Sequence, residues 1–130
     1  MNLIKSTIPE QGGGNDPAIN ALDAPYAVIP QAASGAIAAT QGFLPITKAG
    51  VAALTLPVPT AGLPSAGGND GQVLSLVDTT GYAHTITTPS NGLNGNKHIA
   101  TFGGTVGQFV ELYAYNAVWY VMASSGVTLS

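Results

Sequence analysis

The fold class follows most clearly from one stretch of the sequence, Gln108-Phe109-Val110-Glu111-Leu112-Tyr113-Ala114-Tyr115-Asn116-Ala117-Val118-Trp119-Tyr120-Val121-Met122-Ala123. It holds two runs rich in aromatic and β-branched residues, which favour strands. The two residues between the runs, Asn116-Ala117, have the length of a tight hairpin loop. Side chains alternate along a strand, so Val110, Leu112 and Ala114 share one face. The other face would carry Phe109, Glu111, Tyr113 and Tyr115. The sequence therefore predicts a β-hairpin here.

The same pattern of strand-forming runs separated by turns continues toward the N-terminus as far as residue 66. Strands are expected over Gln72 to Val77, Tyr82 to Thr88 and Lys97 to Phe102, with polar or glycine-rich turns between them. Several short strands at near-regular spacing predict an all-β fold, with residues 66–130 forming a small antiparallel sandwich or a barrel-like domain. A domain of this size is marginal alone, because it buries only about 60% of its unfolded surface. Oligomerisation would supply the missing contacts.

Residues 1–65 have a different composition, since they hold eight of the nine prolines. Proline fixes φ and removes a backbone donor, so it is kept out of central strands and helix interiors. We expect an extended N-terminal arm with short strand pieces at 26–29, 44–48 and 51–56. A short helix over Ala18 to Ala24 is a further expectation, because Asp16-Pro17 suits its first positions.

Charge is the scarcest property of the chain. Only 7% of the 130 residues are charged, there is no Arg, and the formal net charge is −3. Three lysines are too few for nucleic-acid binding or for an anionic membrane surface. No apolar run approaches the roughly 20 residues of a membrane helix. The first residues do not form a signal peptide, so we expect synthesis in a cytosol. Cysteine is absent.

No pattern of catalytic or metal-binding residues stands out. His84 and His98 have no partners at zinc-site spacing. Ser75, Asp78 and His84 could be written as a triad, but Ser75 lies inside a predicted strand rather than on the sharp turn that a nucleophile needs. We therefore expect no enzyme, no cofactor and no metal site.

The aromatic residues cluster late in the chain and allow two interpretations. Buried, they would form the core and the contacts between subunits, which their alternation within strands favours. Exposed, they could stack on sugars. The set assigned to the core or to an oligomer interface is Phe102, Phe109, Tyr113, Tyr115, Trp119 and Tyr120.

An ordered set of segments resembles a known family. The segments are Ile46 to Pro57, Gly71 to Leu74, Ala83 to Thr87, Ala100 to Gly104, Leu112 to Asn116, Trp119 to Val121 and Gly126 to Leu129. Together they are similar to small tailed-phage virion proteins of the head-fibre and capsid-decoration (cement) type. The resemblance implies a β-rich homotrimer bound to the major capsid protein on the outer surface of the virion, with no enzymatic activity. One departure concerns the hairpin turn, where Asn-Gly is expected and Ala117 stands instead, a residue that resists positive φ.

Two functions follow as expectations. The first is capsid decoration by an oligomer made in the host cytoplasm, with residues 1–65 as the arm that contacts the capsid or a neighbouring subunit. The larger apolar groups of this arm are its expected anchors: Leu3, Ile4, Tyr26, Val28, Ile29 and Phe43. The second is a carbohydrate- or receptor-binding domain of a phage fibre, which would bind surface glycans through the late aromatics, Trp119 above all.

Overall fold

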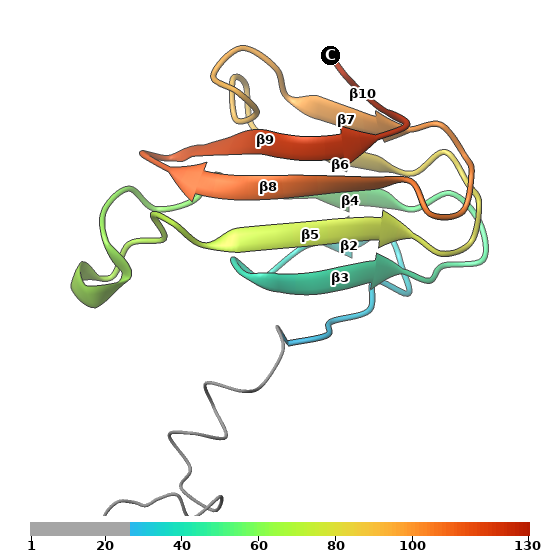
Figure 1. Ribbon diagram of the computed structural model, residues 1–130, viewed down its shortest axis with the longest axis horizontal. Helices are drawn as coiled ribbons and strands as arrows, with labels where there is room; N and C mark the ends of the chain where they lie inside the picture. Colours follow the sequence, from blue (N-terminus) through green and yellow to red (C-terminus); the bar gives the residue numbers. More distant parts are fainter. Residues whose placement is uncertain (1–26) are drawn as a thin grey trace, which may run out of the picture.

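Residues 27–130 are described by a computed structural model, and their nine strands form two packed sheets (Figure 1). The prediction of an all-β fold is confirmed. The expected helix over residues 18–24 and the expected anchors Leu3, Ile4 and Tyr26 lie outside the described residues.

The first sheet has four strands in the order β3-β5-β8-β9 and faces the viewer in Figure 1. The strands are β3 (Gly42–Ile46), β5 (Val73–Asp78), β8 (Phe109–Tyr115) and β9 (Val118–Ser125). β3 runs parallel to β5, whereas β5, β8 and β9 are antiparallel. A register shift between Glu111 and Leu112 marks an irregularity in the β8–β9 ladder.

The second sheet has five strands in the order β10-β7-β6-β4-β2 and lies behind the first. Its strands are β2 (Gly35–Ala36), β4 (Ala53–Thr55), β6 (Thr85–Thr87), β7 (Ile99–Phe102) and β10 (Val127–Leu129). β2, β4 and β6 pair in parallel, whereas β7 is antiparallel to both β6 and β10. Both sheets are therefore mixed. The strands within residues 66–130 pair with one another in the antiparallel sense, as expected, and every parallel strand pairing involves β2, β3 or β4. The remaining element is a short 3-10 turn, η1 (Pro64–Ala66).

The core lies between the two sheets and consists of the inward residues of both. They are Ile37, Leu44, Ile46, Ala52, Leu54, Leu56, Leu74, Leu76, Ile86, Leu93, Ala100, Phe102, Val110, Leu112, Ala114 and Trp119. The alternation predicted for β8 is confirmed, because its buried residues are Val110, Leu112 and Ala114.

Residues 27–65 belong to the sandwich rather than to a separate arm, which corrects the expected domain boundary at residue 65. They supply three strands and six of the core residues. Residues 27–31 also add backbone pairing beside β3: the N–H of Phe43 donates to the carbonyl of Ala27, and the N–H of Ile29 donates to the carbonyl of Phe43, both at 2.9 Å. The expected anchors Val28 and Ile29 therefore sit in the fold, Val28 exposed and Ile29 packed against the core.

Pro45 shows how a strand in the proline-rich half is tolerated. Its carbonyl accepts from the N–H of Gln31 at 2.8 Å, so this side of the residue faces the 27–31 segment. In a regular parallel ladder the N–H of residue 45 would donate to the carbonyl of Ile29, but proline has no N–H. The side chain of Gln31 supplies that donor instead, since its Nε2 lies 3.0 Å from the Ile29 carbonyl oxygen.

The hairpin predicted between β8 and β9 is confirmed, and Tyr115 pairs with Val118 next to the turn. Asn116 has φ of 50° and Ala117 has φ of 66°. Positive φ at both central residues is the signature of a type I′ turn. The loop therefore adopts the conformation typical of Asn-Gly, although its second residue is Ala.

Candidate functional site

Two of the three buried polar side chains of the described chain, Asp78 and His84, lie together at one end of the two sheets, whereas the third, Thr88, follows the opposite end of β6 (Thr85–Thr87). Asp78 is the last residue of β5, and His84 immediately precedes β6. Both side chains are fully buried, and Nε2 of His84 lies 3.1 Å from Oδ1 of Asp78. Thr80, in the loop between them, places its Oγ1 3.2 Å from the same Nε2.

The hydrogen bonds of His84 determine which ring nitrogen carries the proton. The backbone N–H of Ala52 donates to Nδ1 at 2.9 Å, so Nδ1 is an acceptor and carries no hydrogen. Nε2 therefore bears the N–H and donates to the Asp78 carboxylate. The His84 ring thereby joins Ala52, which precedes β4 and lies 32 positions from His84 in the sequence, to Asp78 at the end of β5.

The carboxylate of Asp78 is held by backbone donors as well. The N–H groups of Thr80 and Gly81 donate to Oδ1 at 2.9 and 2.7 Å. Burial opposes ionisation of this carboxyl group, but the two backbone donors and the adjacent His84 together outweigh it, so the pKa of Asp78 lies below its ordinary value of 3.8. Its second oxygen, Oδ2, has no hydrogen-bond partner among residues 27–130.

This arrangement is suited to holding loops together and not to attacking a substrate. The hydroxyl of Thr80 and the carboxylate of Asp78 meet the same ring nitrogen, while the other nitrogen is bound to backbone. No second nitrogen is left to pass a proton on, as a triad requires. Ser75 does not complete a triad, because it is partly exposed on the outer side of β5, whereas Asp78 points inward.

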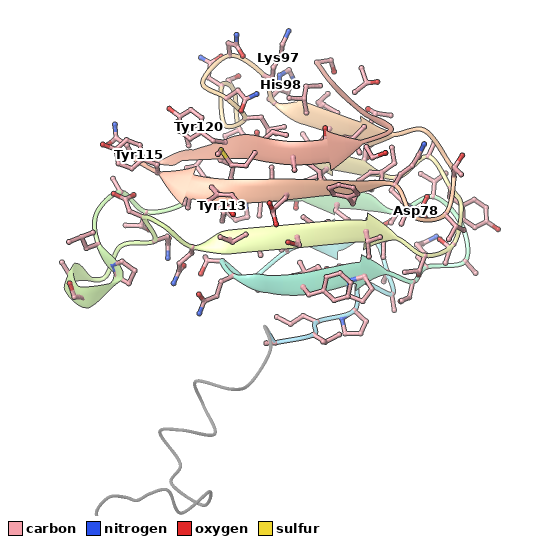
Figure 2. The ribbon with its side chains drawn as sticks, viewed as in Figure 1. Asp78, Lys97, His98, Tyr113, Tyr115 and Tyr120 are labelled. Atoms are coloured by element: carbon pink, nitrogen blue, oxygen red, sulfur yellow. The ribbon has the colours of Figure 1, made fainter. Side chains whose placement is uncertain are left out.

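The largest chemically distinctive surface is the outer side of the four-stranded sheet, which we call the aromatic face. It is formed by the outward residues Phe43, Pro45, Val73, Ser75, Val77, Phe109, Glu111, Tyr113, Tyr115, Val118, Tyr120, Ala123 and Ser125. Figure 2 shows Tyr113, Tyr115 and Tyr120 together at the hairpin end of β8 and β9. Tyr113 is paired directly with Tyr120 across the two strands.

The aromatic face carries one charged group, Glu111, at its middle. Glu111 is opposite Ser75 on one side and Ala123 on the other. Within residues 27–130 it has neither a salt bridge nor a hydrogen bond to its side chain. Around it, five aromatic side chains are between 36% and 62% exposed.

The outer side of the five-stranded sheet has a different chemistry, and we call it the threonine face. Its outward positions are Ala53, Thr55, Thr85, Thr87, Ile99, Thr101 and Thr128. The registers place Thr128 beside Thr101 and Thr101 beside Thr85. This face is small, hydroxyl-rich and free of aromatic groups.

The structure sorts the expected aromatic set into two groups. Phe102 and Trp119 are in the core, and the indole N–H of Trp119 donates to the carbonyl of Pro57 at 2.9 Å. Phe109, Tyr113, Tyr115 and Tyr120 lie on the aromatic face, joined there by the expected arm residue Phe43. Alternation of side chains along β8 and β9 explains this division between core and surface, since Trp119 is paired with the buried Ala114 and Tyr120 with the exposed Tyr113.

Residues 27–130 hold no cluster of metal ligands and no membrane-spanning helix. In that part of the chain no three His, Asp or Glu side chains lie close enough to hold a metal ion, and no pocket opens between them. No helix described there has the length and hydropathy needed to cross a bilayer.

Comparison with known proteins does not identify a family or a function for the chain. No family model matches the chain, and a search of the curated proteins finds no match.

Proposed function

We propose that this protein is a non-enzymatic virion structural protein, which decorates the outer surface of a phage capsid as an oligomer and bridges and stabilises capsid subunits. The observation that carries the proposal is the composition of its surface. Residues 27–130 contain five charged side chains, Lys48, Asp70, Asp78, Lys97 and Glu111, and Asp78 is fully buried. About a quarter of the residues of an ordinary soluble domain are charged.

Exposed apolar groups occupy the surface in place of charge. Besides the aromatic face, Val28, Leu63, Val106 and Met122 are each at least 60% exposed. Large apolar patches on a protein of this kind mark surfaces that a partner covers. A protein bound in an assembly has partners that cover such patches, whereas a free monomeric enzyme or nucleic-acid binder does not.

The capsid enters the proposal through the resemblance to head-fibre and decoration proteins. The segments that carry it, from Ile46 to Leu129, all fall within the sandwich, on strands or on the loops that join them. We propose the major capsid protein as the partner, a homotrimer as the oligomer and the outer virion surface as the location. The residues before Ala27 remain the proposed capsid-contacting segment.

A second candidate function rests on the three exposed tyrosines of the aromatic face. Tyr113, Tyr115 and Tyr120 are 37%, 62% and 37% exposed, so their rings are open to a sugar. Trp119 cannot take this role because it is fully buried. A fibre domain that binds surface glycans through the tyrosines is therefore the alternative.

The proposed function is tested by purifying virions that encode the chain and measuring its copy number on intact particles by mass spectrometry. Particles stripped of the protein should regain it on addition of the full-length chain and should resist heating better afterwards. Removal of residues 1–26 is the informative truncation, because removal of 1–45 also takes the core residues Ile37 and Leu44. Absence of the protein from particles would contradict the proposal, and unimpaired binding after removal of 1–26 would contradict the role of that segment.

A further inference from the structure

We infer that the aromatic face is the surface through which copies of this chain pack against one another. The inference rests on the proposed oligomeric assembly and names the occupant of one surface, a second copy. The other possible occupants, a capsid subunit or a saccharide, are outcomes of the test below.

The first argument is area. Phe43, Phe109, Tyr113 and Tyr120 are 36–37% exposed and Tyr115 is 62% exposed. With about 200 Å² for each aromatic side chain, these five groups alone offer roughly 400 Å². A standard interface buries about 800 Å² on each partner. The aromatic side chains alone therefore supply about half of this area, and the valines, Pro45 and Ala123 of the same face add to it.

The second argument is apolar character. Interfaces between identical subunits are more apolar than those of transient complexes, and aromatic residues are enriched in them. The aromatic face fits this description with one charged group among thirteen outward residues. The outer sheets of three copies can pack against one another around a three-fold axis, with side chains interdigitating as they do between packed sheets. The threonine face lacks both features.

The third argument is complementarity at the one charged position. Within residues 27–130 the carboxylate of Glu111 and the hydroxyls of Tyr113, Tyr115 and Tyr120 make no hydrogen bond. A phenolic O–H is a donor and a carboxylate is an acceptor. A second copy of the face therefore brings donors for Glu111 and acceptors for the tyrosines. The face is self-complementary without a lysine or arginine, which this chain nearly lacks.

The test places the same charge on each of the two outer surfaces. Phe109→Lys puts an ammonium on the aromatic face, and Thr87→Lys puts one at the middle of the threonine face. The mass of the full-length protein is measured by analytical ultracentrifugation over a range of concentrations, and circular dichroism checks the fold. The new ammonium lies two residues along β8 from Glu111, but replacing a packed aromatic side chain by a buried ion is unfavourable even when the ion is paired, so Phe109→Lys should raise the dissociation constant about a hundredfold or more. Thr87→Lys should leave it within about threefold.

Tyr115→Lys is the second variant, because Tyr115 is the most exposed of the five aromatics and lies at a strand end. It keeps the test decisive if Phe109→Lys fails to fold. A monomeric wild type at about 100 µM would overturn the inference. Disruption by Thr87→Lys but not by either aromatic-face variant would also overturn it, in favour of the threonine face.

The same variants separate this inference from the proposed function. An oligomer that dissociates on Phe109→Lys but is absent from particles supports the inference and contradicts capsid decoration. A monomer that decorates particles, and loses binding on Phe109→Lys, overturns the inference and makes the face a capsid contact. A monomer that binds glycan arrays through Tyr115 overturns both.

Discussion

Replacing Ala117 by Gly should stabilise this protein, because the hairpin turn holds Ala117 at a φ of 66°. A side chain in the left-handed region costs an L-residue roughly 1–2 kcal/mol, and Gly escapes this cost. Gly also makes the unfolded chain more flexible, which removes about 0.4–1 kcal/mol. The net gain in the free energy of unfolding is then about 0.5–1 kcal/mol. For a chain of this size this raises Tm by about 2–6 °C.

The turn is anchored independently of residue 117, so its geometry should survive the change. The N–H of Asn116 donates to Oδ1 of Asp70 at 2.9 Å. Tyr115 and Val118 remain paired on either side. Thermal unfolding is followed by circular dichroism at one fixed protein concentration, because Tm of an oligomer depends on concentration.

Ala53→Gly is the matched control. Ala53 is exposed within β4 and does not have positive φ. The same Ala-to-Gly change should lower stability there by about 0.5–1 kcal/mol. If Ala117→Gly lowers Tm as Ala53→Gly does, Ala117 does not adopt the left-handed conformation and the type I′ assignment is wrong.

Three further predictions concern the core and the buried polar cluster. The pKa of Asp78 is lowered in the folded state, so its ionised form adds stability above about pH 3.8 that is lost as the pH falls through the folded pKa. Urea unfolding between about pH 2 and 6 should therefore show a shallower pH dependence in Asp78→Asn than in wild type, and equal slopes would exclude this role. His84→Ala should lower the free energy of unfolding by about 3–5 kcal/mol, as breaking a buried pair does, whereas Thr80→Ala should cost about 1 kcal/mol in the same urea titration. Trp119→Phe leaves the Pro57 carbonyl without its donor and should cost about 1–3 kcal/mol, and a loss of glycan binding with unchanged stability would instead place Trp119 on the surface.

The sequence by itself determined the C-terminal strands and the two sides of the hairpin. Alternation in β8 is a local property, because successive side chains leave a strand on opposite faces. Val110, Leu112 and Ala114 could therefore be separated from Phe109, Tyr113 and Tyr115 without any knowledge of the partners. The scarcity of charged residues was equally plain, and it already favoured a protein whose surface is covered by partner molecules.

Only the tertiary structure decided which side of the hairpin meets the core. Aromatic residues suit an interior as well as an interface, and the second sheet covers the side with Leu112 rather than the side with Tyr113. The pairing of Asp78 with His84 likewise depends on a third group, the N–H of Ala52, that is distant in sequence.

The proline-rich half shows why local sequence rules alone do not predict strand pairing. Pro45 lies within the strand piece expected at 44–48, but only the structure shows that this strand, β3, lies between residues 27–31 and β5. The missing donor is harmless there because the side chain of Gln31 replaces it. Such a substitution depends on residues 27–31 and β3 meeting in parallel, although residues 32–41 separate them in the chain. Composition could locate the prolines, but only long-range strand pairing could show that the fold accommodates one of them.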